Sequence, residues 1–281
     1  MCPLMITAER PPIFIDALTG IDTVLTLKEW REKIFLTEHV IQIKLDKKME
    51  DHPLCNLQDI ALGEYRIHLQ RLKPLRLSGW VAFSVALKDR EGIPSSLPVV
   101  EGIYSKGGKD NIKPWMDISL AGFAEFRIGK RVDLHVAGLM QGLLRSLSRL
   151  IPPGGHMMIS YEDKDSIHRE THQALSKGVP PIITPLGLLL FYSGFRLVKD
   201  WYLAEGGYEG PRKLWGEKPS DRSWSMIWDE RTARELVDFF NTRKGSTEQK
   251  YIKELQMVAR EVLANLDIKD STLRNTIEDL F

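Results

Sequence analysis

The chain has 281 residues, a mass of 32.2 kDa and a formal net charge of +1, and 43% of its residues are hydrophobic. This near-neutral charge excludes a global basic field that would attract nucleic acid, although it leaves room for a local basic patch. Cys2 and Cys55 lack metal-ligand spacing, which argues against a disulfide framework and a cysteine-based zinc site. No signal-peptide pattern opens the chain, and its longest apolar run, 180–195, is shorter than a membrane span. We therefore expect a cytoplasmic protein that does not enter a membrane.

The first part of the chain predicts one helix followed by strands. Thr26 and Glu29 form a capping box, in which each side chain satisfies a free backbone N–H at a helix start. Apolar and polar residues then alternate over 65–70 and 81–87, as in half-buried strands, and 97–104 is a further strand candidate. Strands that precede the first long helix indicate an antiparallel meander.

The middle of the chain changes to alternating strands and helices. Strand patterns at 123–128 and 131–136 precede a helix over 137–151, and a strand over 156–162 follows it. A polar helix comes next, then a helix that starts at Thr184-Pro185 and ends at Gly194, and finally a strand over 195–203. A helix that connects two neighbouring strands places them in parallel, so the strand from His156 should lie parallel to the one before the helix.

The remainder of the chain is helical and highly charged. One helix is expected from Asp229, a longer one from a cap at Ser246 and Gln249, and a short one near the end. The expected organisation is an α/β domain over 1–218 and a helical appendage over 219–281. Residues 1–116 supply the N-terminal helix and antiparallel strands, and 117–218 supply a second half. The appendage packs on the core or on a partner subunit, which allows a homodimer through the C-terminal helices.

Two stretches resemble the N-acetyltransferase-like (GNAT) superfamily. The first, 135–144, has Gly138 and Leu143-Leu144 in register with the start of that superfamily's cofactor helix. His135 stands where Arg or Gln is usual, and Met140 where Gly or Ala is usual. The second, 188–195, resembles the apolar helix, Gly-Phe and strand that end the cofactor region, although Leu190 replaces the usual tyrosine.

More specifically, four short segments resemble an uncharacterised prokaryotic family of domains of unknown function in the same clan. These segments are 152–158, 178–181, 184–187 and 199–202. The resemblance covers about 117–218, implies a GNAT-like mixed sheet flanked by helices, and assigns no activity.

The resemblance implies an acetyl-CoA or other acyl-CoA cofactor at the helix over 137–151. Free N–H groups and the dipole at a helix start bind phosphate, and small residues let the phosphate approach. The implied cofactor-binding residues are His135, Val136, Gly138, Leu139, Met140 and Gly142. The alternative is an ordinary helix with two packing glycines.

The segment 199–218 is dense in aromatic and charged residues and shows neither helical nor strand periodicity. Such loops beside a sheet edge often form ligand sites, whereas the alternative is a solvated loop whose charges pair with one another. The substrate-binding candidates are Lys199, Asp200, Trp201, Tyr202, Glu205, Glu209 and Lys213, together with Thr184. Thr184 could direct free N–H groups at an anion, or act as a plain N-cap.

Acyl transfer to an amine needs a base, and Glu125 and Glu162 are candidates because each lies in a strand beside the proposed cofactor helix. Tyr192 is a third catalytic candidate, offset from the usual tyrosine position. His168 and His172 have i, i+4 spacing, but no third ligand is indicated, so we expect no metal site.

The leading hypothesis is an acyl-CoA-dependent N-acyltransferase with an unknown, amine-bearing acceptor, although the sequence leaves open whether the protein is an enzyme. The alternative is a non-catalytic member of the fold that binds a small molecule or a macromolecule such as RNA. Arg66, Arg71, Lys73 and Arg76 are the basic residues that RNA binding would use, and the near-neutral net charge argues against it.

Overall fold

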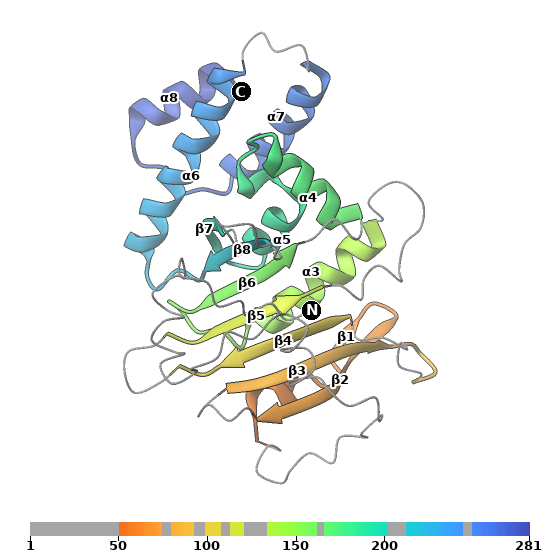
Figure 1. Cartoon of the computed structure of the whole chain (residues 1–281). Coiled ribbons are helices and arrows are strands. Elements are labelled where there is room, and N and C mark those ends of the chain that lie inside the picture. The colour runs from red at the N-terminus through yellow and green to blue at the C-terminus, as the bar shows by residue number, and fades with distance from the viewer. Residues whose placement is uncertain are drawn as a thin grey trace, which may run out of the picture.

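A single eight-stranded sheet organises the computed structural model, with strand order β1-β2-β3-β4-β5-β6-β8-β7 (Figure 1). The structure describes residues 51–74, 80–92, 99–107, 113–120, 134–161, 166–201, 212–243 and 249–281. The helix expected from Thr26 lies outside these residues. No described helix is long and apolar enough to cross a membrane.

The first half of the sheet is the expected antiparallel meander. Its strands are β1 (Ala61–Leu62), β2 (Tyr65–Pro74), β3 (Trp80–Lys88), β4 (Val100–Ser105) and β5 (Trp115–Ser119), each antiparallel to the next. A short 3-10 helix, η2 (Pro53–Leu57), precedes them. A turn follows β3, in which the backbone N–H of Gly92 donates to the carbonyl of Asp89 at 3.1 Å and Gly92 has a φ of +81°.

The second half contains a parallel pair joined by a helix. Helix α3 (Leu134–Ser148) leads to β6 (His156–Tyr161), which pairs in parallel with β5. The parallel partner of β6 is thus β5, over 115–119, whereas the sequence predicted the strand over 131–136 as that partner. The other pairings between described strands are antiparallel.

The last two strands of the sheet come after two α-helices and pair antiparallel with each other. After α4 (Ser166–Ser176), η4 (Pro181–Ile183) and α5 (Pro185–Tyr192), the chain forms β7 (Arg196–Trp201) at the edge. Strand β8 (Arg212–Glu217) then inserts between β6 and β7. The predicted ends of α5 are confirmed: Thr184 Oγ1 accepts from the N–H of Gly187 at 3.2 Å, and Gly194 has a φ of +95°.

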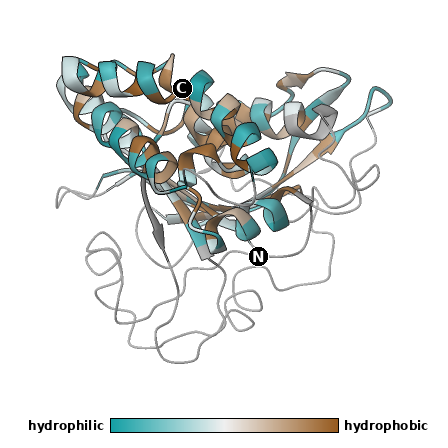
Figure 2. Ribbon diagram, turned by 90° about the horizontal axis from the view of Figure 1, so that it is seen from above, coloured by the Kyte–Doolittle hydropathy of each residue, from teal (hydrophilic) through white to brown (hydrophobic). Residues whose placement is uncertain are grey.

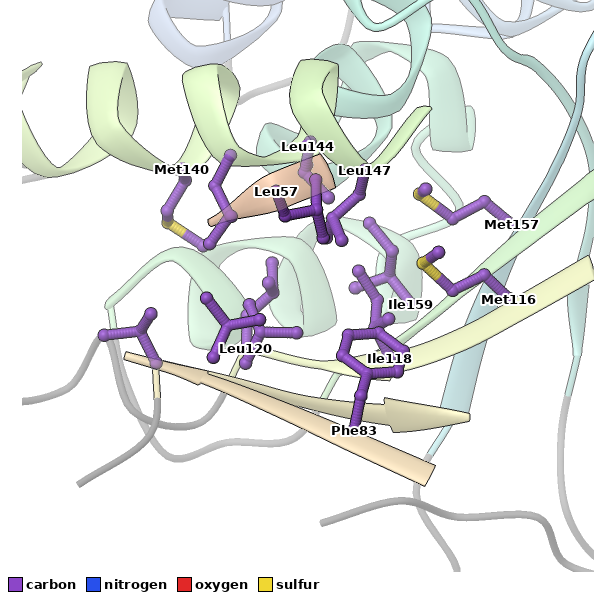
Figure 3. Packing of buried hydrophobic residues seen from close by; sticks show 14 of the residues in the cluster. Leu57, Phe83, Met116, Ile118, Leu120, Met140, Leu144, Leu147, Met157 and Ile159 are labelled. Atoms are coloured by element: carbon purple, nitrogen blue, oxygen red, sulfur yellow. The ribbon is translucent and has the colours of Figure 1, made fainter. Parts of the chain in front are cut away.

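The main hydrophobic core lies between α3 and the sheet. Met140, Leu144 and Leu147 of α3 are at most 1% exposed and face the central strands β5 and β6 (Figure 3). The strand residues they meet are Met116, Ile118, Met157 and Ile159. Seen from above, the described helices gather on one side of the sheet (Figure 2). We call this side the helix-covered face.

The C-terminal helices form a second cluster. Helices α6 (Arg222–Thr242), α7 (Gln249–Leu263) and α8 (Ser271–Leu280) bury a shared set of apolar side chains with η4 and the outer side of α5. A buried ion pair ties this cluster to the sheet, because Arg196 Nε of β7 donates to Asp229 Oδ1 of α6 at 2.5 Å. The appendage thus packs on the α/β core.

Several sequence predictions were wrong. The strand over 131–136 is contradicted from Leu134 onward, where α3 begins, because the amphipathic face of the helix is buried on the sheet. The region 121–133, including the strand predicted at 123–128, lies outside the described residues. Segment 212–217 is a central strand instead of a loop. Helix α6 begins at Arg222 instead of Asp229, since Asp221 caps it by accepting from the N–H of Trp224 at 2.8 Å. The cap expected at Ser246 lies outside the described residues.

Three glycines give a test of this packing. A Cβ at Gly138 meets nothing within 4 Å, so Gly138→Ala should stabilise the protein by about 0.5–1 kcal/mol through helix propensity. A Cβ at Gly187 would lie 1.7 Å from the carbonyl oxygen of Pro181, and one at Gly155 would lie 2.7 Å from that of Pro114. Gly187→Ala and Gly155→Ala should therefore each destabilise it by at least about 1–3 kcal/mol. Melting temperatures from circular dichroism check this, and a loss of stability in Gly138→Ala would contradict it.

Candidate functional site

The face of the sheet opposite α3 carries polar and charged side chains at buried positions. On β5, Met116 and Ile118 point to the helix-covered face, so Trp115, Asp117 and Ser119 point to the other one. Residues paired across neighbouring strands share a face, which extends the second set over the whole sheet. We call this second side the polar face.

A continuous row of polar residues crosses the polar face near the carboxyl ends of β5 and β6. Register pairs connect each member to the next, from β2 through β3, β4, β5 and β6 to β8. In this order the members of the polar row are Arg71, Ser84, Glu101, Ser119, Ser160 and Lys213. Most of the row is buried: Ser84, Ser119, Ser160 and Lys213 are at most 6% exposed, whereas Arg71 and Glu101 are partly exposed.

A buried ion pair lies beside the polar row. The Lys213 ammonium on β8 donates to Asp117 Oδ2 on β5, and both side chains are 0% exposed. Since β6 lies between β5 and β8, the lysine side chain crosses over β6 to reach Asp117. Burial raises the pKa of the Asp117 carboxyl, and the adjacent Lys213 opposes that rise. The pair therefore orients the Lys213 side chain across β6, where Ser160 is its register partner.

The start of α3 lies near the carboxyl ends of β5 and β6, as the polar row does. Near the amino ends of these strands, Lys218 Nζ donates to the carbonyls of Ser148 at 3.0 Å and Ile151 at 2.9 Å, where α3 has ended. Lys218 also donates its backbone N–H to the carbonyl of Gly155, just before β6. The C-terminal end of α3 is thus at the amino end of β6. Its first turn, from Leu134, is accordingly at the carboxyl ends of β5 and β6, where α/β sheets commonly bind ligands.

A second polar group lies toward the amino ends of the same strands. Trp215 Nε1 donates to His156 Nδ1 at 3.0 Å, and Lys113 Nζ donates to Glu217 Oε1 at 2.9 Å. Burial, with a smaller contribution from Lys113, lowers the pKa of His156 to about 4. His156 is consequently neutral at pH 7, with its proton on Nε2. Within the described residues this Nε2 atom has no hydrogen-bond partner.

The predicted cofactor residues all lie on α3 but differ in exposure. Gly138 is exposed, whereas Leu139 and Met140 are 5% and 1% exposed and belong to the core. A Cβ at Gly142 would lie 2.9 Å from Leu62 Cδ2, so this glycine allows close packing against β1. His135 and Val136 occupy the first turn of the helix.

The predicted catalytic and substrate residues are only partly described. Tyr192 ends α5, is 37% exposed, and its carbonyl accepts from Arg145 Nε at 3.4 Å. Thr184 is fully buried as the α5 cap and donates to the carbonyl of Pro181 at 2.7 Å. Lys199 and Trp201 pair in register with Trp215 and Lys213, and Asp200 lies between them on β7. Five candidates lie outside the described residues: Glu125, Glu162, Tyr202, Glu205 and Glu209.

Sequence reasoning selected Lys213 but missed its partner Asp117 and the polar row. The available signal was a single carboxylate within the apolar segment 115–120, and a serine within the apolar segment 156–161. Polar residues inside strands that are otherwise buried usually have a specific partner. No group of three or more potential metal ligands occurs within the described ranges.

The ion pair predicts non-additive stability effects. Lys213→Met and Asp117→Leu should each destabilise the protein by about 3–5 kcal/mol, because each leaves one buried charge without its counterion. The double variant should be more stable than either single one, since no buried charge remains. Urea denaturation measures these differences. Arg90→Met removes an exposed ion pair with Glu64 and should change the midpoint little. Additive single effects would contradict the prediction.

The buried histidine predicts a loss of stability in acid. The folded-state pKa of His156 is about 4, below its usual 6.5, so the unfolded state binds a proton first as the pH falls. The stabilisation is complete above about pH 6.5 and decreases toward pH 4, by about 3 kcal/mol in total. His156→Gln keeps an acceptor for Trp215 and should make the pH dependence of unfolding shallower. An unchanged dependence between pH 4 and 6.5 would contradict this assignment.

Comparisons with known proteins agree with this fold and leave its activity open. A protein of unknown function, AQ1966 from Aquifex aeolicus VF5, has a crystal structure similar to this one, with a TM-score of 0.55 and 22% identity. The similarity covers 72% of this chain and 92% of that one, and at this identity it shows the fold alone. No curated protein matches the sequence. The model of a family described as proteins of unknown function, DUF1122, matches residues 63–243. The chain therefore belongs to the DUF1122 family.

Proposed function

We propose that this protein has a GNAT-like arrangement and acts as an acyl-CoA-dependent N-acyltransferase. The observation that carries the proposal is the position of α3, which connects the parallel strands β5 and β6 and begins at the edge where the polar row lies. The resemblance implies this geometry: a cofactor helix between two neighbouring parallel strands. It also implies that the strand after Gly194-Phe195 borders the acceptor site, on the side opposite the cofactor. In this structure β7 follows Gly194-Phe195.

The start of α3 supplies the features that a pyrophosphate needs. The first four N–H groups of a helix have no partner within the helix, and here they belong to residues 134–137. The helix dipole adds partial positive charge at the same point. Gly138 follows this turn, is exposed and has open space around it, so a phosphate can approach the backbone. Met140, by contrast, serves the core, and its contribution is to hold α3 on the sheet.

The proposed reaction transfers an acyl group from sulfur to nitrogen. The acceptor amine attacks the thioester carbonyl, a C–N bond forms, the C–S bond breaks, and coenzyme A leaves as a thiolate. The amine proton passes to a carboxylate, for which Glu125 and Glu162 remain the candidates. In the sequence, Glu162 directly follows Tyr161. Tyr161 is the last residue of β6, and α3 begins near this end of the strand.

Calorimetry with Gly138 variants tests the proposal. Acetyl-CoA or a longer acyl-CoA should bind the full-length protein. Gly138→Phe should weaken binding at least about tenfold, because its ring occupies the approach to the first turn. Gly138→Ala is the matched control and should bind nearly as well. Both substitutions point into open space, so the melting temperatures should show that both variants fold. Absence of heat with every acyl-CoA at millimolar concentration would favour a non-catalytic binding protein instead.

A further inference from the structure

The polar row contains a buried hydroxyl, that of Ser160, to which no described residue is hydrogen-bonded. Ser160, the fifth of the six members of the row, is 3% exposed, and within the described part of the chain its Oγ has no hydrogen-bond partner. Buried hydroxyl groups are nearly always hydrogen-bonded, because an unsatisfied one destabilises the folded state. By contrast, Ser146 of α3 is equally buried and donates to the carbonyl of Gly142 at 2.9 Å.

Groups of opposite charge flank this hydroxyl along the row. Ser160 pairs in register with Ser119 on one side and with Lys213 on the other. Glu101 pairs with Ser119, so a carboxylate, two hydroxyls and an ammonium follow one another across four adjacent strands. Adjacent strands are about 4.8 Å apart, which places the Cα atoms of Glu101 and Lys213 about 14 Å apart. The Lys213 side chain extends toward β5, which shortens the distance between its ammonium and β4 further.

The ion pair with Asp117 determines the direction in which the Lys213 side chain extends. Lys213 is the register partner of Ser160, and its side chain extends over β6 toward Asp117 instead of toward the outer edge of β8. The lysine side chain and the Ser160 hydroxyl therefore share the same part of the polar face. Two strands away from Ser160 on the other side, Glu101 is partly exposed. A ligand with one cationic and one anionic end matches this order of charges.

We propose that the polar row binds a free amino acid as the acceptor, with its carboxylate near Ser160 and Lys213 and its amine toward Glu101. This inference rests on the proposed N-acyltransferase function for the role of the amine, and on the row alone for the binding. The hydroxyl of Ser160 donates to the carboxylate, and Ser119 offers a second donor. Burial strengthens these hydrogen bonds because water is excluded from the β6 end of the row.

Titration calorimetry with the common L-amino acids, one at a time, tests the inference on the full-length protein. At least one of them should bind, and its decarboxylated amine should bind at least about tenfold more weakly, because it lacks the group that Ser160 and Lys213 recognise. Ser160→Ala should weaken amino-acid binding about tenfold or more and leave acyl-CoA binding unchanged. Ser146→Ala, which removes a buried serine outside the row, should bind normally.

Each outcome separates the inference from the proposed function. If acyl-CoA binds but no amino acid does, or if Ser160→Ala binds amino acids like the unmodified protein, the inference is wrong and the function stands. If amino acids bind and no acyl-CoA does, the row is a binding site and the acyltransferase function is wrong. Should Ser160→Ala fail to fold, Ser119→Ala provides the same test with the neighbouring hydroxyl. Equal affinity for an amino acid and its decarboxylated amine would also overturn the inference.

Discussion

Lys213 extends from β8 across β6 to the carboxylate of Asp117 on β5, and both side chains are fully buried. Taking two charges out of water is unfavourable, so such a pair stabilises a fold less than its short contact indicates. Its main effect here is on register. A shift of β8 by one residue would turn Lys213 to the helix-covered face, where Leu214 now packs. The ammonium would then lie in an apolar core without a counterion.

The fixed register of β8 has consequences for both faces of the sheet. On the helix-covered face, Leu214 is part of the core against which α3 and α5 pack. That core holds the start of α3 near the carboxyl ends of β5 and β6. On the polar face, the same register places Lys213 beside Ser160, and Trp215 within reach of His156. One strand therefore links the position of the proposed cofactor helix to that of the proposed acceptor row.

The C-terminal helices depend on the same part of the sheet. Arg196 begins β7, which pairs with β8, and its guanidinium group contacts Asp229 of α6. Asp229 is 1% exposed and also accepts from the backbone N–H of Asp267 at 3.0 Å, in the segment between α7 and α8. The buried carboxylate thus fixes three segments at once. This explains why the charged C-terminal region packs on the α/β core through a specific polar contact as well as through its apolar cluster.

Local patterns in the sequence predicted several elements correctly. The alternation in β2, the apolar stripe of α3, and the Thr184 and Gly194 ends of α5 can all be recognised within a few residues. Strand β3 was also predicted, but as half-buried, whereas both of its faces are buried. Strands β5 and β8 were missed because each carries a charged side chain at a fully buried position. A strand buried on both faces need not alternate between apolar and polar residues, and Asp117 and Lys213 are tolerated there because each is the partner of the other.

The candidate site was decided by tertiary structure. Asp117, Ser160 and Lys213 are far apart in the sequence and adjacent in the sheet, because β8 inserts between β6 and β7 instead of adding at the edge. No local signal specifies that insertion. It depends on which strand order buries Leu214 on one face while giving Lys213 a counterion on the other. The sequence by itself thus determined the main helices and most of the strands, whereas pairing between distant strands decided which polar side chains meet.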